Sequence, residues 1–130
     1  MEKGHIFYTG PLAQSKAIEF ARQNNMQTID MTELGEYTTE WCQQIKKAKI
    51  EKEGWTEQEF WQRIGRQVWE SMSRSFAFST PTHQKDVYVF IERDYSKSQK
   101  KYQNPTAGVL HSVEHPALKA LGKNIHVYLV

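Results

Sequence analysis

The sequence predicts an α/β protein with a mainly parallel sheet and flanking helices. Short apolar and aromatic segments alternate along the chain with longer segments of helical periodicity, which is the pattern of a parallel layered fold. The segment Asp86–Glu92, DVYVFIE, is a near-continuous apolar run typical of a strand buried on both faces. With 130 residues, of which 38% are hydrophobic, we expect one packed core and a single domain over residues 1–130.

The N-terminal half reads as strand, helix, strand and helix. His5–Gly10 (HIFYTG) is apolar and aromatic and ends at a Gly-Pro turn, where Pro11 occupies a favoured first position of a helix. Gln27–Ile29 reads as a second short strand. A weaker helical stretch begins at Thr32, continues into a lysine-rich tail that we expect to face water, and stops at Gly54.

The C-terminal half begins with a capping box, Thr56-x-x-Glu59, that predicts the start of a long helix. Gly108–Glu114 reads as a strand, Pro116–Leu121 as one or two helical turns, and Asn124–Val130 as the last strand. One buried stripe of the long helix is predicted at Phe60, Ile64, Val68, Met72 and Phe76.

Composition excludes several classes of function. No run approaches the ~18 consecutive apolar residues of a membrane-spanning helix, so we expect no membrane partner. Cys42 is the only cysteine, which excludes an intramolecular disulfide and makes a thiolate zinc site a poor expectation. The net charge of +2 is too small to indicate nucleic-acid binding, and we expect none.

Two acidic residues fall at or near the ends of predicted strands. Asp30 follows the second strand directly, Glu114 ends the strand candidate near the C-terminus, and Tyr8 and Thr9 lie at the end of the first strand. Ligands of parallel sheets bind beyond the carboxyl ends of the strands, so these residues could share one rim. Paired carboxylates are used in glycosidic bond cleavage, although two ordinary surface acids would look the same in the sequence.

The long helix carries a second candidate pair. Trp69 and Ser73 are four residues apart, so their side chains lie on the same side of the helix. They could line a pocket with an aromatic wall and a hydroxyl donor. The plainer alternative is that Trp69 belongs to the core.

Two further clusters suggest other chemistry. His111 and His115 flank Glu114 with a spacing that suits a metal site on a helix, but the predicted strand there argues against a metal. The segment Tyr95–Tyr102 interleaves aromatic and basic side chains, as an RNA-contacting loop or a site for an acidic protein partner would, although a solvated loop explains it as well. Its lysines are Lys97, Lys100 and Lys101.

Five segments, in order, resemble the ADP-ribosyl cyclase family, whose members convert NAD+ to ADP-ribose or cyclic ADP-ribose. They are IFYTG, TIDMTELG, WESMSRSFA from Trp69 to Ala77, DVYVFI, and SVE from Ser112 to Glu114. The similarity runs from about Ile6 to the C-terminus and implies that family's catalytic fold. WESMSRSFA is the closest of the five, matching the family's Trp-x-x-x-Ser-Arg-x-Phe-Ala helix.

The resemblance implies roles for individual residues. Glu114 takes the place of the catalytic glutamate, Trp69 stacks beside the nicotinamide end, and Ser73 lies near the phosphates and ribose. Asp30 contacts the nicotinamide amide and influences cyclisation against hydrolysis. The substrate-binding positions implied are Tyr8, Thr9, Asp30, Trp69 and Ser73.

The chain departs from the family at several places. Asp30 is one methylene shorter than the glutamate often found there, Tyr8 replaces a tryptophan, and His111 stands where a glycine is common. The disulfides and the N-terminal helical region of animal members are missing.

The resemblance therefore predicts an NAD(P)+ glycohydrolase, with or without some cyclase activity, that needs no metal and no cofactor besides its substrate. The absence of a signal-peptide pattern and of disulfides suggests a toxin domain of contact-dependent bacterial competition, delivered by the producing cell and acting in the target-cell cytoplasm. Such a domain would have a cognate immunity protein. Two alternatives stay open: an RNase or RNA-binding toxin domain that uses Tyr95–Tyr102, and a catalytically silent nucleotide-binding module.

Overall fold

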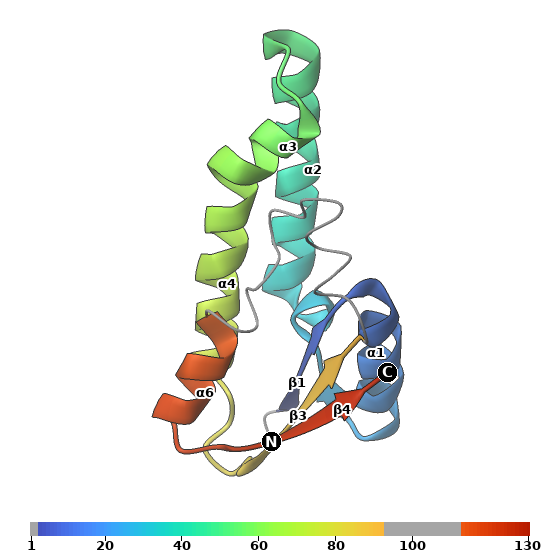
Figure 1. Cartoon of the computed structure of the whole chain (residues 1–130), viewed down its shortest axis with the longest axis vertical. Coiled ribbons are helices and arrows are strands. Elements are labelled where there is room, and N and C mark those ends of the chain that lie inside the picture. The colour runs from blue at the N-terminus through green and yellow to red at the C-terminus, as the bar shows by residue number, and fades with distance from the viewer. Residues whose placement is uncertain (1–2, 93–112) are drawn as a thin grey trace.

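The computed structural model describes residues 3–92 and 113–130. Its centre is a four-stranded, all-parallel sheet in the order β2-β1-β3-β4, which confirms the predicted α/β class (Figure 1). The strands are β1 (Gly4–Thr9), β2 (Met26–Gln27), β3 (Asp86–Ile91) and β4 (Asn124–Leu129). The predicted loop 95–102 and the first five residues of the strand predicted at 108–114 lie outside the described residues.

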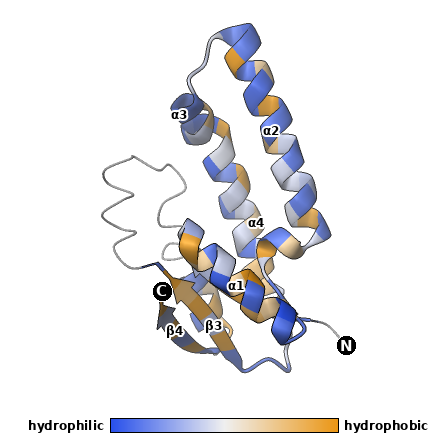
Figure 2. Cartoon of the chain, turned by 90° about the vertical axis from the view of Figure 1, so that its right-hand side faces the viewer, coloured by the Kyte–Doolittle hydropathy of each residue, from blue (hydrophilic) through white to orange (hydrophobic). Residues whose placement is uncertain are grey.

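Helices connect the strands and cover the sheet. They are α1 (Pro11–Gln23), the short 3-10 helix η1 (Ile29–Met31), α2 (Glu33–Glu53), α3 (Glu57–Phe60), the π-helical turn η2 (Trp61–Gly65), α4 (Arg66–Phe78) and α6 (His115–Ala120). Figures 1 and 2 show α2 and α4 rising from the same end of the sheet and meeting at their far ends through α3. Over the described ranges 3–92 and 113–130, no helix is both long and apolar enough to cross a bilayer.

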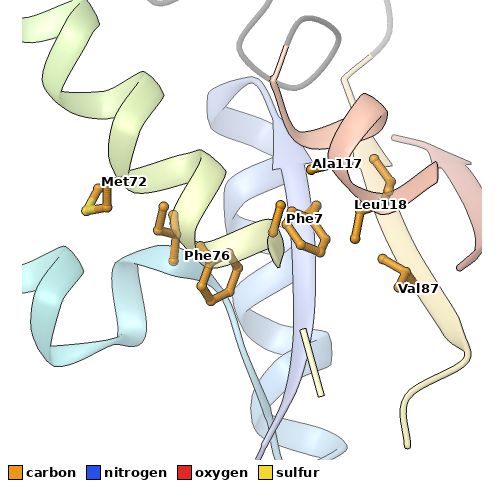
Figure 3. Close-up of a cluster of buried hydrophobic side chains, with 9 residues drawn as sticks. Phe7, Met72, Phe76, Val87, Ala117 and Leu118 are labelled. Carbon is orange, nitrogen blue, oxygen red and sulfur yellow. The ribbon is translucent and has the colours of Figure 1, made fainter. Parts of the chain in front are cut away.

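Each face of the sheet has its own apolar layer, because successive strand residues point to opposite sides. On one face, Ile6 and Phe90 pack against the buried alanines of α1, which are Ala13, Ala17 and Ala21. On the other face, strand residues pack against α4 and α6 (Figure 3). That second layer contains Phe7, Val87, Val89, Met72, Phe76, Ala77, Ala117 and Leu118.

The predicted long helix is not one continuous α-helix. Its capping box is present, with Glu59 N donating to Thr56 Oγ1 at 3.1 Å, but a π-helical turn interrupts it at Trp61–Gly65. The indole of Trp61 packs over Gly65 so closely that a Cβ there would lie 2.1 Å from the ring. A π turn holds more residues than an α turn, so the buried stripe changes phase. Phe60, Met72 and Phe76 are buried as predicted, whereas Ile64 and Val68 are only half-buried.

Candidate active site

The parallel register of β1 and β2 brings Tyr8 and Asp30 together. Gly4 pairs with Met26 and His5 with Gln27, an offset of 22 residues that also separates Tyr8 from Asp30. The Tyr8 hydroxyl donates a hydrogen bond to Asp30 Oδ2. Asp30 lies in η1, three residues after the end of β2, so the prediction that it follows a strand ending at Ile29 is wrong in detail. The placement of Asp30 beside the end of β1 stands.

The residues around Asp30 explain the local sequence TIDMTELG. Thr32 caps α2, since its hydroxyl accepts from Gly35 N at 3.0 Å and donates to Ile29 O at 2.6 Å. Gly35 lets α2 begin directly against η1, because a Cβ there would stand 1.9 Å from Ile29 O. The threonine and the glycine therefore fix the short turn that presents Asp30.

Glu114 is buried, with a relative exposure of 7%, and stands at the start of α6. Its backbone angles are helical (φ −73°, ψ −47°), so the prediction that it ends a strand is wrong. The segment HPAL contains Ala117 and Leu118 at positions that anchor a helix in the core, and this apolar anchoring outweighs the β-type pattern before it. Proline at the first turn also favours a helix.

The electrostatics join Glu114 to the other two residues. Burial raises the pKa of the Glu114 carboxyl to about 8, and the negative charge of Asp30 contributes to the same shift. The pKa of the Tyr8 hydroxyl lies far above its ordinary range. Burial is the largest cause, and the charge of Asp30, the hydrogen bond to Asp30 and the charge of Glu114 raise it further. Tyr8 therefore stays protonated and acts as a donor. We call Glu114, Asp30 and Tyr8 together the acid cluster.

Trp69 and Ser73 lie on α4, on the side that faces the sheet. Trp69 is half-buried and packs against the core layer that includes Ile29, next to Asp30, and Ala117, three residues after Glu114. Ser73 is buried with 5% exposure. The packing thus ties Trp69 to the layer that borders the acid cluster, whereas no hydrogen bond within residues 3–92 and 113–130 links Ser73 to the cluster.

Thr9 is the last residue of β1 and is half-buried. Its carbonyl accepts from Glu92 N at 3.1 Å, which extends the pairing of β1 with β3 by one residue. Because side chains alternate along a strand, Thr9 points away from the face that carries Tyr8. The structure therefore places Thr9 at the same strand end as Tyr8 but on the opposite face.

The sequence reasoning missed Gln14. Its Nε2 donates to the Tyr8 hydroxyl at 3.1 Å from the first turns of α1. The sequence held one signal for it. Gln14 stands three residues before Ala17 and seven before Ala21, which places a polar side chain beside the apolar stripe of its helix.

In the part of the chain that the structure describes, no group of three or more His, Cys, Asp and Glu side chains could hold a metal ion. His115 is half-buried at the start of α6, and His111 lies outside the described residues.

Comparison with known proteins adds no relative. No protein-family model matches the chain, and no curated protein or solved structure is significantly similar to it.

Proposed function

We propose that this protein is an NAD(P)+ glycohydrolase that cleaves the bond between nicotinamide and ribose, with Glu114 as its catalytic residue. The observation that carries the proposal is the acid cluster: a buried glutamate close to a second carboxylate, with a tyrosine donor beside them. No Lys or Arg within the described ranges forms an ion pair with Glu114 or Asp30. Two acids that have no cation among these residues are suited to receive one.

The pyridinium of NAD(P)+ is such a cation. In the free protein most Glu114 is protonated at pH 7, because its pKa is about 8. A positive charge beside the carboxyl favours the ionised form and so lowers that pKa. Substrate binding thereby generates the carboxylate at the place where the reaction needs it.

The reaction places further positive charge near Glu114. The C1′–N bond breaks, its electron pair leaves with neutral nicotinamide, and the ribose becomes an oxocarbenium-like cation. A fixed carboxylate in a site of low dielectric stabilises this charge as it develops. Water then adds to C1′ and loses a proton, which gives ADP-ribose; attack by the adenine instead would give the cyclic product.

The remaining residues have supporting roles in this proposal. The indole of Trp69 attracts the pyridinium face by about 0.5–2 kcal/mol. Asp30 accepts a hydrogen bond from the nicotinamide amide, while the Tyr8 hydroxyl holds the Asp30 carboxylate in place. Ser73 directs its hydroxyl toward the phosphates and ribose. These roles follow from the resemblance to the cyclase family, joined with the packing of Trp69 and the hydrogen bond of Tyr8.

The test is to incubate the protein with NAD+ or NADP+ and follow free nicotinamide. We expect Glu114→Gln, which keeps the size and removes the charge, to lower turnover at least about 100-fold, or about 2.7 kcal/mol of barrier. The matched control is Glu19→Gln, the same change on an exposed position of α1. Full turnover by Glu114→Gln would remove Glu114 from the mechanism, and no nicotinamide from the unaltered protein would reject the activity.

The cellular role is a proposal of the same kind, and it rests on the activity. A disulfide-free NAD(P)+ glycohydrolase released in a target cell would act as a toxin, and its producer would need an immunity protein. Expression in the cytosol should therefore arrest growth while NAD(P)+ falls, and Glu114→Gln should abolish both effects. Growth arrest with a constant NAD(P)+ level and degraded RNA would instead support a nuclease.

A further inference from the structure

A directed chain of hydrogen bonds runs from α1 into the acid cluster. Gln14 Nε2 donates to the Tyr8 hydroxyl at 3.1 Å, and that hydroxyl donates to Asp30 Oδ2. A tyrosine hydroxyl carries one proton. Its oxygen accepts from the Gln14 amide and an ionised Asp30 can only accept, so both partners direct the tyrosine proton to Asp30.

The helix that carries Gln14 is firmly held. Ala13 and Ala17, on either side of Gln14, are fully buried against the sheet, and Gln14 N donates to Gly10 O at 2.9 Å. Only Gly10 separates β1 from α1, so Tyr8 and Gln14 belong to one compact strand–turn–helix unit. The backbone of Gln14 is therefore held in place, and its side chain is half-buried beside Tyr8.

We propose that Gln14 is a positioning residue that acts through Tyr8 to aim the Asp30 carboxylate toward Glu114. The proposal rests on the proposed function, in which Asp30 and Glu114 face the cationic substrate together. Asp30 is half-buried, so a carboxylate released from Tyr8 can turn toward solvent. Gln14 prevents that turn by holding the Tyr8 hydroxyl so that its O–H stays directed at Asp30.

The pKa of Glu114 reports the position of the Asp30 carboxylate in the absence of substrate. Within residues 3–92 and 113–130, the charged and titratable groups that interact with Glu114 are Asp30 from η1 and Tyr8 from β1. The negative charge of Asp30 is the second cause, after burial, of the raised Glu114 pKa. A carboxylate that turns away must therefore lower the Glu114 pKa, while the contribution of burial stays. The hydrogen bond from Gln14 also lowers the pKa of Tyr8, which makes Tyr8 a better donor.

The experiment titrates the Glu114 carboxyl carbon by NMR in substrate-free protein, with the signal assigned by its loss in Glu114→Gln. Asp30→Asn removes the whole contribution of Asp30 and sets the lower limit of the Glu114 pKa. We expect Gln14→Met, which keeps the length but cannot donate, to give a value between this limit and that of the unaltered protein. The control is Ser15→Ala, at the neighbouring exposed position of α1, which should leave the pKa unchanged.

A double variant tests whether Gln14 acts through Tyr8. In a Tyr8→Phe background there is no hydroxyl to orient, so Gln14→Met should shift the Glu114 pKa no further. An unchanged pKa in Gln14→Met, or an equal shift with and without the tyrosine hydroxyl, would overturn the proposal. If Gln14→Met does not fold, Gln14→Asn keeps the amide but shortens its reach, and the same outcomes apply.

These titrations separate the two proposals, because they require no turnover. If the shifts appear but no nicotinamide is released, the positioning role of Gln14 stands and the glycohydrolase proposal fails. If nicotinamide is released and the shifts are absent, the reverse holds.

Discussion

Acidic and aromatic side chains meet in two regions of this molecule, and the two regions treat charge in opposite ways. At the far end of α2 and α3, which we call the hairpin tip, Glu53, Glu57 and Glu59 each pair with a cation. Lys46 pairs with Glu57 at 3.2 Å and Lys49 with Glu53 at 2.7 Å. At the acid cluster, Asp30 and Glu114 stand near one another with only Tyr8 as a described donor to them.

The aromatic rings follow the same division. Lys49 and Arg63 lie over the Trp55 ring at 4.9 and 5.0 Å, so that indole already has its cations. Trp69 packs on the core with no cation among the described ring contacts. Most acids of the hairpin tip have a cation, whereas no Lys or Arg among residues 3–92 and 113–130 pairs with an acid of the acid cluster. The comparison teaches that composition alone does not mark a site, because what matters is which acids have no cation beside them among the described residues.

The largest expected effect in this comparison is the loss of folding stability that follows from ionising the buried Glu114 carboxyl. The ordinary glutamate pKa of 4.5 rises to about 8 in the folded protein. Below about pH 4.5 Glu114 is protonated in both states; between the two values only the unfolded chain releases its proton, so folding stability falls as pH rises. Over pH 5 to 8 this loss is on the order of 3 kcal/mol.

Glu114→Gln should therefore be more stable than the unaltered protein at pH 8 and nearly equal to it at pH 5. The measurement is the free energy of unfolding by denaturant at both pH values, with Glu19→Gln as the control for an exposed acid. A gain of the same size at both pH values would show that the carboxylate charge is not the cause, and a loss at pH 8 would contradict the comparison.

A second change would make the acid cluster resemble the hairpin tip. Gln14→Lys keeps a donor beside Tyr8 and adds a positive charge near Asp30. We expect this charge to lower the Glu114 pKa and to compete with the pyridinium, which raises the KM for NAD+ about tenfold, or about 1.4 kcal/mol of binding. Steady-state nicotinamide release checks this prediction, and Ser15→Lys, with the same charge one residue away, is the control. A KM unchanged by Gln14→Lys would mean that the cluster does not receive the cationic end of the substrate.

The two regions also differ in what the sequence could predict. The strands of the sheet were predicted because their apolar and aromatic runs are local signals, and Asp86–Ile91 is the clearest of them. The proximity of Tyr8 to Asp30 depends on strand order and register, which no local pattern contains. The helical start at Glu114 was missed because its preceding residues have a strand-like pattern, while burial of Ala117 and Leu118 decides the structure.

The hairpin tip was predicted only in part. The lysines of α2 were expected to face water, but Lys46 and Lys49 lie over the rings of Trp61 and Trp55. Lys46 pairs with Glu57, which is 11 positions away on the other side of the turn. The 3.6-residue period of a helix does not predict a pair at this spacing. Gln14 was missed for a related reason. A single glutamine beside an apolar stripe does not indicate a role until the fold shows that it donates to the Tyr8 hydroxyl.

The smallest expected effect comes from the hairpin tip itself. Lys49→Met removes one exposed ion pair and one cation over Trp55, while Arg63 stays over the same ring. Exposed pairs contribute about 0–1 kcal/mol, so the free energy of unfolding should fall by less than about 1 kcal/mol, and nicotinamide release should not change. If Lys49→Met instead lowered turnover as strongly as Gln14→Lys, the hairpin tip would belong to the functional surface, and the contrast between the hairpin tip and the acid cluster would be wrong.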